Sequence, residues 1–276
     1  MPESKKNKFY KAILAAVVYI FAICYMFPVI IAVLNSFKEK REILISAVSL
    51  PSSLYLENYK TVILKADFFK VFFNSIALTV SSIVLIIIIS AMAGYAIARW
   101  RRKVANVIML IFLSAMFVPF HTVMITLLKT AKDLGATGNF PGLVLIYGAL
   151  MCPTSIFLFR GFVKSIPIEL EESGIIDGCN IFNLALRIVF PLMKPISATV
   201  AVINALWIWN DFLLPYLILA KPLTIPLSQM YFYGKYNQQW HLIMAGFVIS
   251  TIPIVVFFFS MQKFIIKGLV SGAIKN

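Results

Sequence analysis

Six long stretches of this chain carry almost no charge, and they constrain the fold more than any other feature. Five of them hold no Asp, Glu, Lys or Arg, and the sixth holds only Asp211. Each is long enough to cross a bilayer as a helix, which takes about 20 apolar residues. Because a spanning backbone must satisfy its own hydrogen bonds in lipid, the spans should be helical. The stretches are 12–37, 71–98, 104–128, 135–159, 196–220 and 242–262.

The composition of the 276-residue chain also indicates a membrane protein. Hydrophobic residues make up 61% of it, whereas a soluble domain has about half its residues apolar. The core of a globular protein of this size could not bury the additional apolar residues. We therefore predict an all-α membrane protein in which residues 1–276 form a single transmembrane domain. Its six transmembrane helices are expected at about 12–35, 71–98, 104–128, 141–163, 196–219 and 242–262.

Basic residues set the expected orientation of the spans. The formal net charge is +14, and 15 of the 25 Lys and Arg residues fall in segments on the N-terminal side of the membrane. The short loop 99–103 alone holds four of them. Because Lys and Arg close to span ends mark the cytoplasmic side, both termini should be cytoplasmic. This topology accounts for the positive charge without a nucleic-acid partner.

Two common kinds of site lack support in the sequence. Cys24, Cys152 and Cys179 lie far apart and show neither a pairing pattern nor metal-ligand spacing. The phosphate-binding motif G-x-x-x-x-G-K-[ST] is absent, since the one Gly-Lys pair is Gly234-Lys235. We therefore expect the chain itself to bind no metal and no ATP. The apolar run near the N-terminus is too long for the core of a cleaved signal, so it is taken as the first span.

The segment 164–195, between the fourth and fifth spans, is polar and acidic. Four of the eleven acidic residues of the chain fall within nine residues of this segment. Pro167 suits the first turn of a helix, where the helix dipole also favours carboxylates. We expect Ser165 or Ile166 to cap this first helix and Gly178 to end it with a bend. The acidic residues are Glu169, Glu171, Glu172 and Asp177.

A second short helix should follow the bend. Asn180 can cap it, and Pro191 and Pro195 should stop it before the fifth span. Its apolar residues recur at helical spacing and form a face that we expect to anchor the segment to its own subunit. A helix lying on lipid headgroups would carry Lys and Arg on its polar face, so the acidic charge favours a protein partner. The apolar face consists of Phe182, Leu186, Val189 and Phe190.

The spacing of this segment resembles the EAA loop of permease subunits in ATP-binding-cassette importers. That loop has the pattern E-A-A, three residues, G, and later a leucine before a proline. Glu172 and Gly178 match the pattern, and the small residues Ser173 and Gly174 replace the two alanines. The later part of the pattern falls on Phe190 and Pro191, where phenylalanine replaces leucine.

A second resemblance covers the C-terminal half of the chain. Trp209, Asn210, Asp211 and Phe212 look like the WNDF segment of carbohydrate-uptake permeases. Residues 262–275 resemble the tail of the maltose-type G subunit of that family, and the similarity spans about 74–276. It implies a permease of the bacterial cytoplasmic membrane whose segment 164–195 is a cytoplasmic coupling loop.

The resemblance also implies partners and a mechanism. The chain would pair with a second, different permease subunit and with two ATPase subunits that bind ATP and Mg²⁺. An extracytoplasmic binding protein would deliver sugar, and transport would proceed by alternating access. The resemblance assigns ATPase coupling to Glu171, Glu172, Ser173, Gly174, Asp177, Gly178 and Pro191. It assigns the sugar path to Trp209, Asn210 and Asp211.

The residues leave two placements open for Asp211. An ionisable group at membrane depth usually faces a cavity or a partner, so Asp211 lines the sugar path in the first placement. In the second it lies near the outer interface, hydrogen-bonded to neighbouring helix ends.

Two other function classes have weaker support. A secondary transporter driven by an ion gradient would need ionisable residues at the midplane and repeated halves, and Asp211 is the one carboxylate within a predicted span. A membrane enzyme would need an acid–base or metal constellation, and none is found in the sequence.

Overall fold

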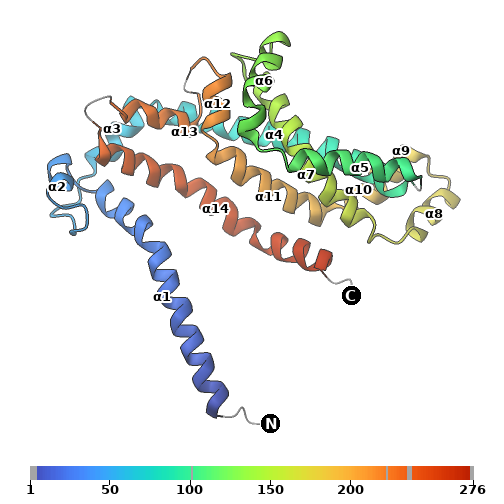
Figure 1. The fold of residues 1–276 in the computed structure, drawn as a ribbon, viewed down its shortest axis with the longest axis horizontal. Helices are drawn as coiled ribbons and strands as arrows, with labels where there is room; N and C mark the ends of the chain where they lie inside the picture. The colour runs from blue at the N-terminus through green and yellow to red at the C-terminus, as the bar shows by residue number, and fades with distance from the viewer. Residues whose placement is uncertain (1–4, 101, 222, 235–237, 274–276) are drawn as a thin grey trace. The chain divides into compact units, whose positions relative to one another are not determined.

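The computed structural model describes residues 5–100, 102–221, 223–234 and 238–273, and every regular element within these ranges is helical (Figure 1). The all-helical prediction is confirmed for this part of the chain. A π-helical turn, Ala185–Val189, joins α9 to α10, and a 3₁₀ turn, Gln229–Phe232, follows α13. The α-helices are α1 (Lys5–Ser36), α2 (Lys40–Ile45), α3 (Glu57–Lys65), α4 (Phe68–Arg99), α5 (Lys103–Met116), α6 (Phe120–Asp133), α7 (Phe140–Val163), α8 (Glu169–Ile176), α9 (Ile181–Leu184), α10 (Phe190–Leu192), α11 (Lys194–Asn210), α12 (Leu213–Ile218), α13 (Ile225–Ser228) and α14 (Trp240–Ala273).

Four helices are long and apolar enough to cross a membrane, and two bent helix pairs could each form one more span. The four spans agree with the predicted ones to within a few residues. The described residues therefore hold four to six candidate spans, and the count of six stays a prediction. The four are Ile13–Ser36, Phe68–Arg99, Phe140–Val163 and Trp240–Gln262. The bent pairs are Lys103–Met116 with Phe120–Asp133 and Ile181–Leu192 with Lys194–Asn210.

The third predicted span is not one continuous helix. Its first part, α5, ends at Met116, and α6 leaves at an angle of 102°. Pro119 stands at the break, where it has no N–H to donate and restricts the residue before it. The 14 residues of α5 rise about 21 Å, which is less than the roughly 30 Å of a bilayer core.

The fifth predicted span is also shorter than expected. We predicted a helix over 196–219, but α11 ends at Asn210 and the short α12 begins at Leu213. Asp211 has extended backbone angles, with φ −72° and ψ 122°, so it interrupts the helix. Average hydropathy did not reveal this break because it lies within a long, mostly apolar stretch.

Contacts divide the chain into two compact units. Unit 1 comprises Met1–Phe68 and Gln229–Ile252, and unit 2 comprises Phe69–Ser228 and Pro253–Asn276. The prediction of a single domain concerns how the units combine, and it stays a prediction.

In unit 1, the segment between α1 and α3 is ordered around a buried lysine. Lys38 is fully buried, and its Nζ donates to the Ser46 carbonyl at 3.0 Å and to the Ser49 hydroxyl at 3.3 Å. The Asn58 amide donates to the carbonyl of Lys38 at 2.8 Å and to that of Ser36 at 2.9 Å. These bonds satisfy polar groups that would otherwise be costly to bury. The segment between α1 and α3 is therefore folded, and we call it the cap of unit 1.

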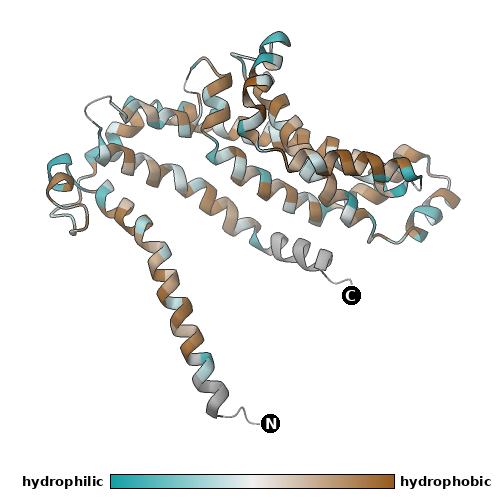
Figure 2. Ribbon diagram, in the orientation of Figure 1, coloured by the Kyte–Doolittle hydropathy of each residue, from teal (hydrophilic) through white to brown (hydrophobic). Residues whose placement is uncertain are grey.

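Helix α1, also in unit 1, exposes apolar side chains around most of its circumference. Figure 2 shows brown, hydrophobic residues along most of its length. Tyr19, Phe21 and Tyr25 are 70%, 61% and 80% exposed. A helix that is hydrophobic all round must be surrounded by lipid or by other apolar protein. These side chains therefore indicate a membrane-embedded helix.

The core of unit 2 lies among α4, α7 and α11. It includes the fully buried side chains Ile86, Tyr147, Phe159 and Val200. At Gly94 the backbone of α4 comes so close to α7 that a Cβ atom would lie 2.6 Å from that of Phe159. Small residues permit this approach between spanning helices. Helices α4 and α7 are therefore in tight contact near their Arg99 and Val163 ends.

Candidate functional site

Helix α8 forms the first arm of the predicted coupling loop. It begins at Glu169 with Ile168 in the capping position, so the predicted caps at Ser165 or Ile166 were two to three residues too early. Ser165 instead donates its hydroxyl to the Phe162 carbonyl at 2.6 Å, at the end of α7. The first turn of α8 contains three glutamates, as predicted, where the helix dipole favours them.

Gly178 ends α8 in a backbone conformation that glycine adopts without strain. Its φ is +84°. The Cys179 N–H donates to the Gly174 carbonyl and the Gly178 N–H donates to the Ile175 carbonyl, both at 3.0 Å. This pair of bonds is the Schellman arrangement, which satisfies the last carbonyls of a helix. The predicted bend at Gly178 therefore has a defined geometry.

The second arm is a continuous helical run from α9 through the π-helical turn to α10. Asn180 caps it as predicted, because its side-chain oxygen accepts from the Asn183 N–H at 2.8 Å. Pro191 does not stop the run, contrary to our prediction, and lies within α10. The Phe190 N–H donates to the carbonyl of Ala185, five residues back. This wider turn directly precedes Pro191, whose ring would crowd the i−4 carbonyl of a regular α-helix.

Pro195 opens the next helix and does not end the second arm. It occupies the first turn of α11, where a missing N–H costs little. The second arm ends at Leu192, and one residue, Met193, separates it from the first residue of α11. The two are bent by 68° relative to each other.

The two arms touch at Gly174. A Cβ atom there would lie 2.6 Å from Cδ1 of Ile188 and 2.9 Å from Cδ1 of Leu184. Gly174 is buried under these side chains. We call the whole structure, residues 164–195, the elbow.

The apolar face of the second arm is divided, so the predicted anchoring of the elbow to its own chain holds only for the part that contains Val189 and Phe190, which packs against the core of unit 2. Val189 is buried, but Phe182 and Leu186 are 78% and 65% exposed. Further apolar side chains at the bend are also exposed, and together they form what we call the elbow tip. Apolar patches on a surface usually mark an interaction site. The elbow tip consists of Ile175, Ile176, Ile181, Phe182 and Leu186.

The acidic residues of the elbow have different surroundings. Glu169, Glu172 and Asp177 are exposed, whereas Glu171 is buried. Arg99 donates from Nε to Oε1 of Glu171 at 2.7 Å and also forms an ion pair with it. Of the acidic side chains on α8, those of Glu169 and Glu172 are thus accessible to a partner.

The partners of Glu171 were not predicted from the sequence. The Tyr95 hydroxyl donates to Oε2 of Glu171 at 2.8 Å, so both carboxylate oxygens are bound from α4. One feature of the sequence could have indicated that Glu171 is buried. The small residue Gly174 lies three positions later, so the two residues share a face of the helix. Glu172 falls on another face of α8.

Asp211 joins two helices. Its Oδ1 accepts from the backbone N–H groups of Leu213 at 3.0 Å and Leu214 at 3.3 Å, in the first turn of α12. Its Oδ2 accepts from the Tyr147 hydroxyl of α7 at 2.9 Å. Bonding to a neighbouring helix end was one of the two placements left open for Asp211. Tyr147 was not predicted as a partner.

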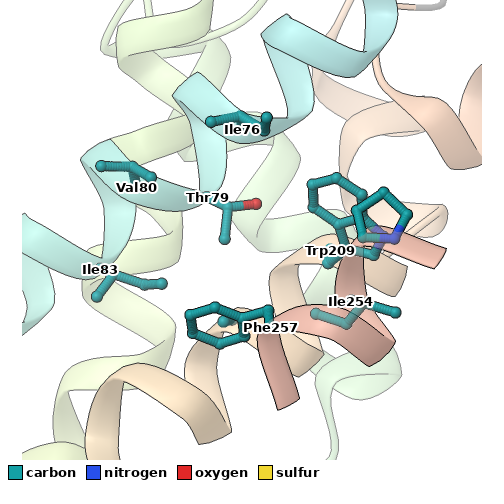
Figure 3. A pocket seen from close by; sticks show the side chains of 9 residues that line it. Ile76, Thr79, Val80, Ile83, Trp209, Ile254 and Phe257 are labelled. Carbon is teal, nitrogen blue, oxygen red and sulfur yellow. The ribbon is translucent and has the colours of Figure 1, made fainter. Parts of the chain in front are cut away.

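The three residues assigned to the sugar path lie at two different cavities of unit 2. Asn210 and Asp211 line a cavity of about 470 Å³ together with His121 and Trp207. Trp209 lines a separate cavity of about 240 Å³ (Figure 3). In Figure 3 its ring faces a space bounded by aliphatic side chains of α4 and by Ile254 and Phe257 of α14. The sequence placed these three side chains together, and the structure separates them.

The larger cavity has mixed chemistry. Aromatic rings of Phe120, Trp207 and Phe212 lie beside the amide of Asn210 and the carboxylate of Asp211. The smaller cavity has a single hydroxyl, that of Thr79, among apolar side chains. Among the residues that the structure describes, no three His, Cys, Asp or Glu side chains are grouped to hold a metal ion.

Comparisons with known proteins identify the family. Residues 86–271 match the family described as binding-protein-dependent transport system inner membrane component. The chain is 39% identical over 260 residues to the probable starch degradation products transport system permease protein AmyC of Thermoanaerobacterium thermosulfurigenes, which covers 93% of this chain and 94% of that protein. It is 35% identical over 279 residues to the multiple sugar-binding transport system permease protein MsmG of Streptococcus mutans, covering 99% of each.

A solved structure shares the fold. It is the crystal structure of a bacterial ABC transporter involved in the import of the acidic polysaccharide alginate, with a TM-score of 0.83 and 23% identity. The match covers 95% of this chain and 98% of the solved chain. The helical architecture, the apolar spans and the family match agree, and the chain belongs to the inner membrane components of binding-protein-dependent transport systems.

Proposed function

We propose that this chain is a transmembrane permease subunit of an ATP-driven, binding-protein-dependent importer of sugars or oligosaccharides. Relatives named as permeases for starch degradation products and for multiple sugars support this substrate class. The chain would pair with a second permease subunit, two ATPase subunits that bind ATP and Mg²⁺, and an extracytoplasmic binding protein. The basic residues at the Arg99 end of α4 support a cytoplasmic location for that end and for both termini.

The exposed surface of the elbow is the observation that carries this proposal. The apolar elbow tip lies beside the exposed carboxylates of Glu169, Glu172 and Asp177. An apolar centre with a charged rim is typical of a protein interface. The Schellman turn at Gly178 and the close crossing at Gly174 hold the two arms together, which suits an element that would transmit a movement. Of the coupling residues assigned by resemblance, Glu172, Ser173, Asp177 and Gly178 are exposed on this surface, whereas Glu171 and Gly174 are buried beneath it.

The larger cavity is the part of unit 2 that best suits a sugar. Flat aromatic faces and a few polar groups are the usual contents of a small-molecule site, and Trp207, Asn210 and Asp211 supply them. We propose that Asn210 and Asp211 lie on the sugar path. Trp209, on the other cavity, would hold α11 against α4.

Alternating access would then follow from ATP-driven movement of the ATPase subunits. Their closure would displace the elbow, and the displacement would rock the helices of unit 2 between two arrangements. The energy enters the chain from outside, since the sequence lacks a phosphate-binding loop.

Reversing the charge of Glu172 tests the coupling role. The complex of permease and ATPase subunits is reconstituted in proteoliposomes with the binding protein, and sugar uptake and ATP hydrolysis are measured together. Glu172→Lys should leave membrane insertion intact but separate ATP hydrolysis from uptake. Glu57→Lys, on the exposed surface of α3, is the matched control and should change neither.

Two outcomes would contradict the proposal. Normal coupled uptake by Glu172→Lys would remove the role of the elbow. Uptake by the wild-type complex without ATP, driven by an ion gradient, would favour the secondary transporter.

A further inference from the structure

A buried ion pair joins the elbow to the end of α4. The side chain of Glu171 is 8% exposed and that of Arg99 is 20% exposed. Arg99 binds Oε1 of Glu171, and Tyr95 binds Oε2. We call these three residues the α4 clamp. Its residues come from parts of the chain that are 72 positions apart.

We propose that the α4 clamp is a positioning device that makes α4 follow the elbow when an ATPase subunit moves it. This inference rests on the proposed function, because it requires that the elbow receive the movement. It assigns a role to Tyr95 and Arg99, and it gives Glu171 a different role from that of its exposed neighbour Glu172.

The bonding pattern suits this role. Hydrogen bonds between charged groups are stronger than neutral ones, and a guanidinium fixes direction as well as charge. Arg99 also donates from its NH2 group to the carbonyl of Ile166, at 3.0 Å. The Arg99 guanidinium therefore binds both the loop that precedes α8 and the first turn of α8.

The other described hydrogen bonds of α8 are local. Among the described hydrogen bonds of α8, those made by Glu171 are the ones that connect it to a long apolar helix. Tyr95 and Arg99 are four residues apart and so lie on the same face of α4. A movement of α8 therefore acts on α4 through two adjacent points on one face.

Packing then carries the movement further into unit 2. The backbone of α4 is in close contact with α7 at Gly94, so the two helices should move together. Toward its other end α4 supplies Ile76, Thr79 and Val80 to the wall of the smaller cavity. Helix α7 supplies Tyr147, which binds Asp211 beside the larger cavity. The clamp is thus connected by contiguous contacts to both cavities.

The test separates a positioning role from a purely structural one. Replacing Glu171 alone would leave the partly buried Arg99 without its charged partner, which destabilises proteins. The double variant Arg99→Gln/Glu171→Gln removes both charges and leaves neutral side chains that can hydrogen-bond. It is reconstituted with the ATPase subunits and the binding protein, and three quantities are measured: ATPase subunits retained per complex, ATP hydrolysis and sugar uptake.

We expect the double variant to retain ATPase subunits and to hydrolyse ATP, but to transport less sugar per ATP. Coupling between sites typically corresponds to a factor of about 5 to 150, so a decrease of at least about fivefold is expected. Arg99→Lys keeps the charge but loses the planar fork, and it should give a smaller decrease. Unchanged uptake per ATP in the double variant would overturn the inference.

A distance measurement keeps the proposal testable if the double variant is poorly assembled. Spin labels are placed at Arg187, an exposed position on the second arm of the elbow, and at Ile88, an exposed position of α4, in a background without the native cysteines. With the clamp intact, ATP binding should change this distance little, because α4 follows the elbow. In Arg99→Lys the change should be larger, and an equal change in both proteins would refute the clamp.

The controls distinguish the clamp from the proposed function. If Glu172→Lys uncouples transport while the clamp variants behave like wild type, the clamp is wrong and the proposed function stands. If wild-type proteoliposomes show no ATP-dependent uptake at all, the proposed function itself fails.

Discussion

Replacing Gly178 should weaken docking of the ATPase subunit through the backbone alone. A Cβ atom at this position would have no heavy atom of this chain within 4 Å, so it would cause no steric clash. The backbone φ at this position, however, is +84°. A residue other than glycine pays about 1–2 kcal/mol for this left-handed conformation. If the elbow binds its partner only in this bent form, that energy lowers the equilibrium ratio of the bent form to other forms by a factor of about 5–30.

A series of substitutions checks this magnitude. Asn tolerates the left-handed region better than other residues, and β-branched residues tolerate it worst. We expect affinity for the purified ATPase subunit, measured by titration of the solubilised permease complex, to fall in the order Gly, Asn, Ala, Val at position 178. In the unbound permease, Gly178→Leu should destabilise the bend no more than Gly178→Ala, because the space around the Cβ atom is open. An Ala variant with the affinity of wild type would refute the reasoning.

Two further predictions concern stability. Gly94→Ala should destabilise the crossing of α4 and α7 by about 1–3 kcal/mol, because its Cβ would overlap that of Phe159 and the neighbouring backbone. Thermal unfolding of the solubilised complex measures this, and Gly161→Ala, in open space on α7, should not lower the unfolding temperature; equal decreases would contradict the packing argument. Lys38→Ala should loosen the cap of unit 1, since hydrogen bonds to charged groups contribute about 1.5–3 kcal/mol. Limited proteolysis of the 39–56 segment should be faster than in Lys60→Ala, an exposed control, and equal rates would argue against the role of the buried lysine.

The long spans were predictable because lipid imposes a length on apolar segments. The charged residues at their ends, such as Arg99 and Lys103, marked the boundaries to within a few residues. The bends were not predictable from hydropathy. Met116 and Asn210 end helices inside apolar stretches, where the average composition does not change. Local backbone chemistry at Pro119 determines the first of these breaks.

The elbow shows the same division between local and distant causes. Its bend at Gly178 and its cap at Asn180 depend on neighbouring residues, and both were predicted. The burial of Glu171 depends on Arg99, which is 72 positions away, and no local pattern specifies that pairing. The exposure of Phe182 was also missed, because helical spacing identifies an apolar face but not what covers it.

The π-helical turn at Ala185–Val189 lies between Phe182 of the elbow tip and α11, and it contains Leu186 of the tip. A π turn contains one residue more than the α-helical turn it replaces. Each residue of an α-helix rotates the chain by about 100° around the axis. The chain between Phe182 and α11 therefore carries one residue more than a regular helix would, and this residue rotates the side of the second arm that Phe182 occupies by about 100° relative to α11.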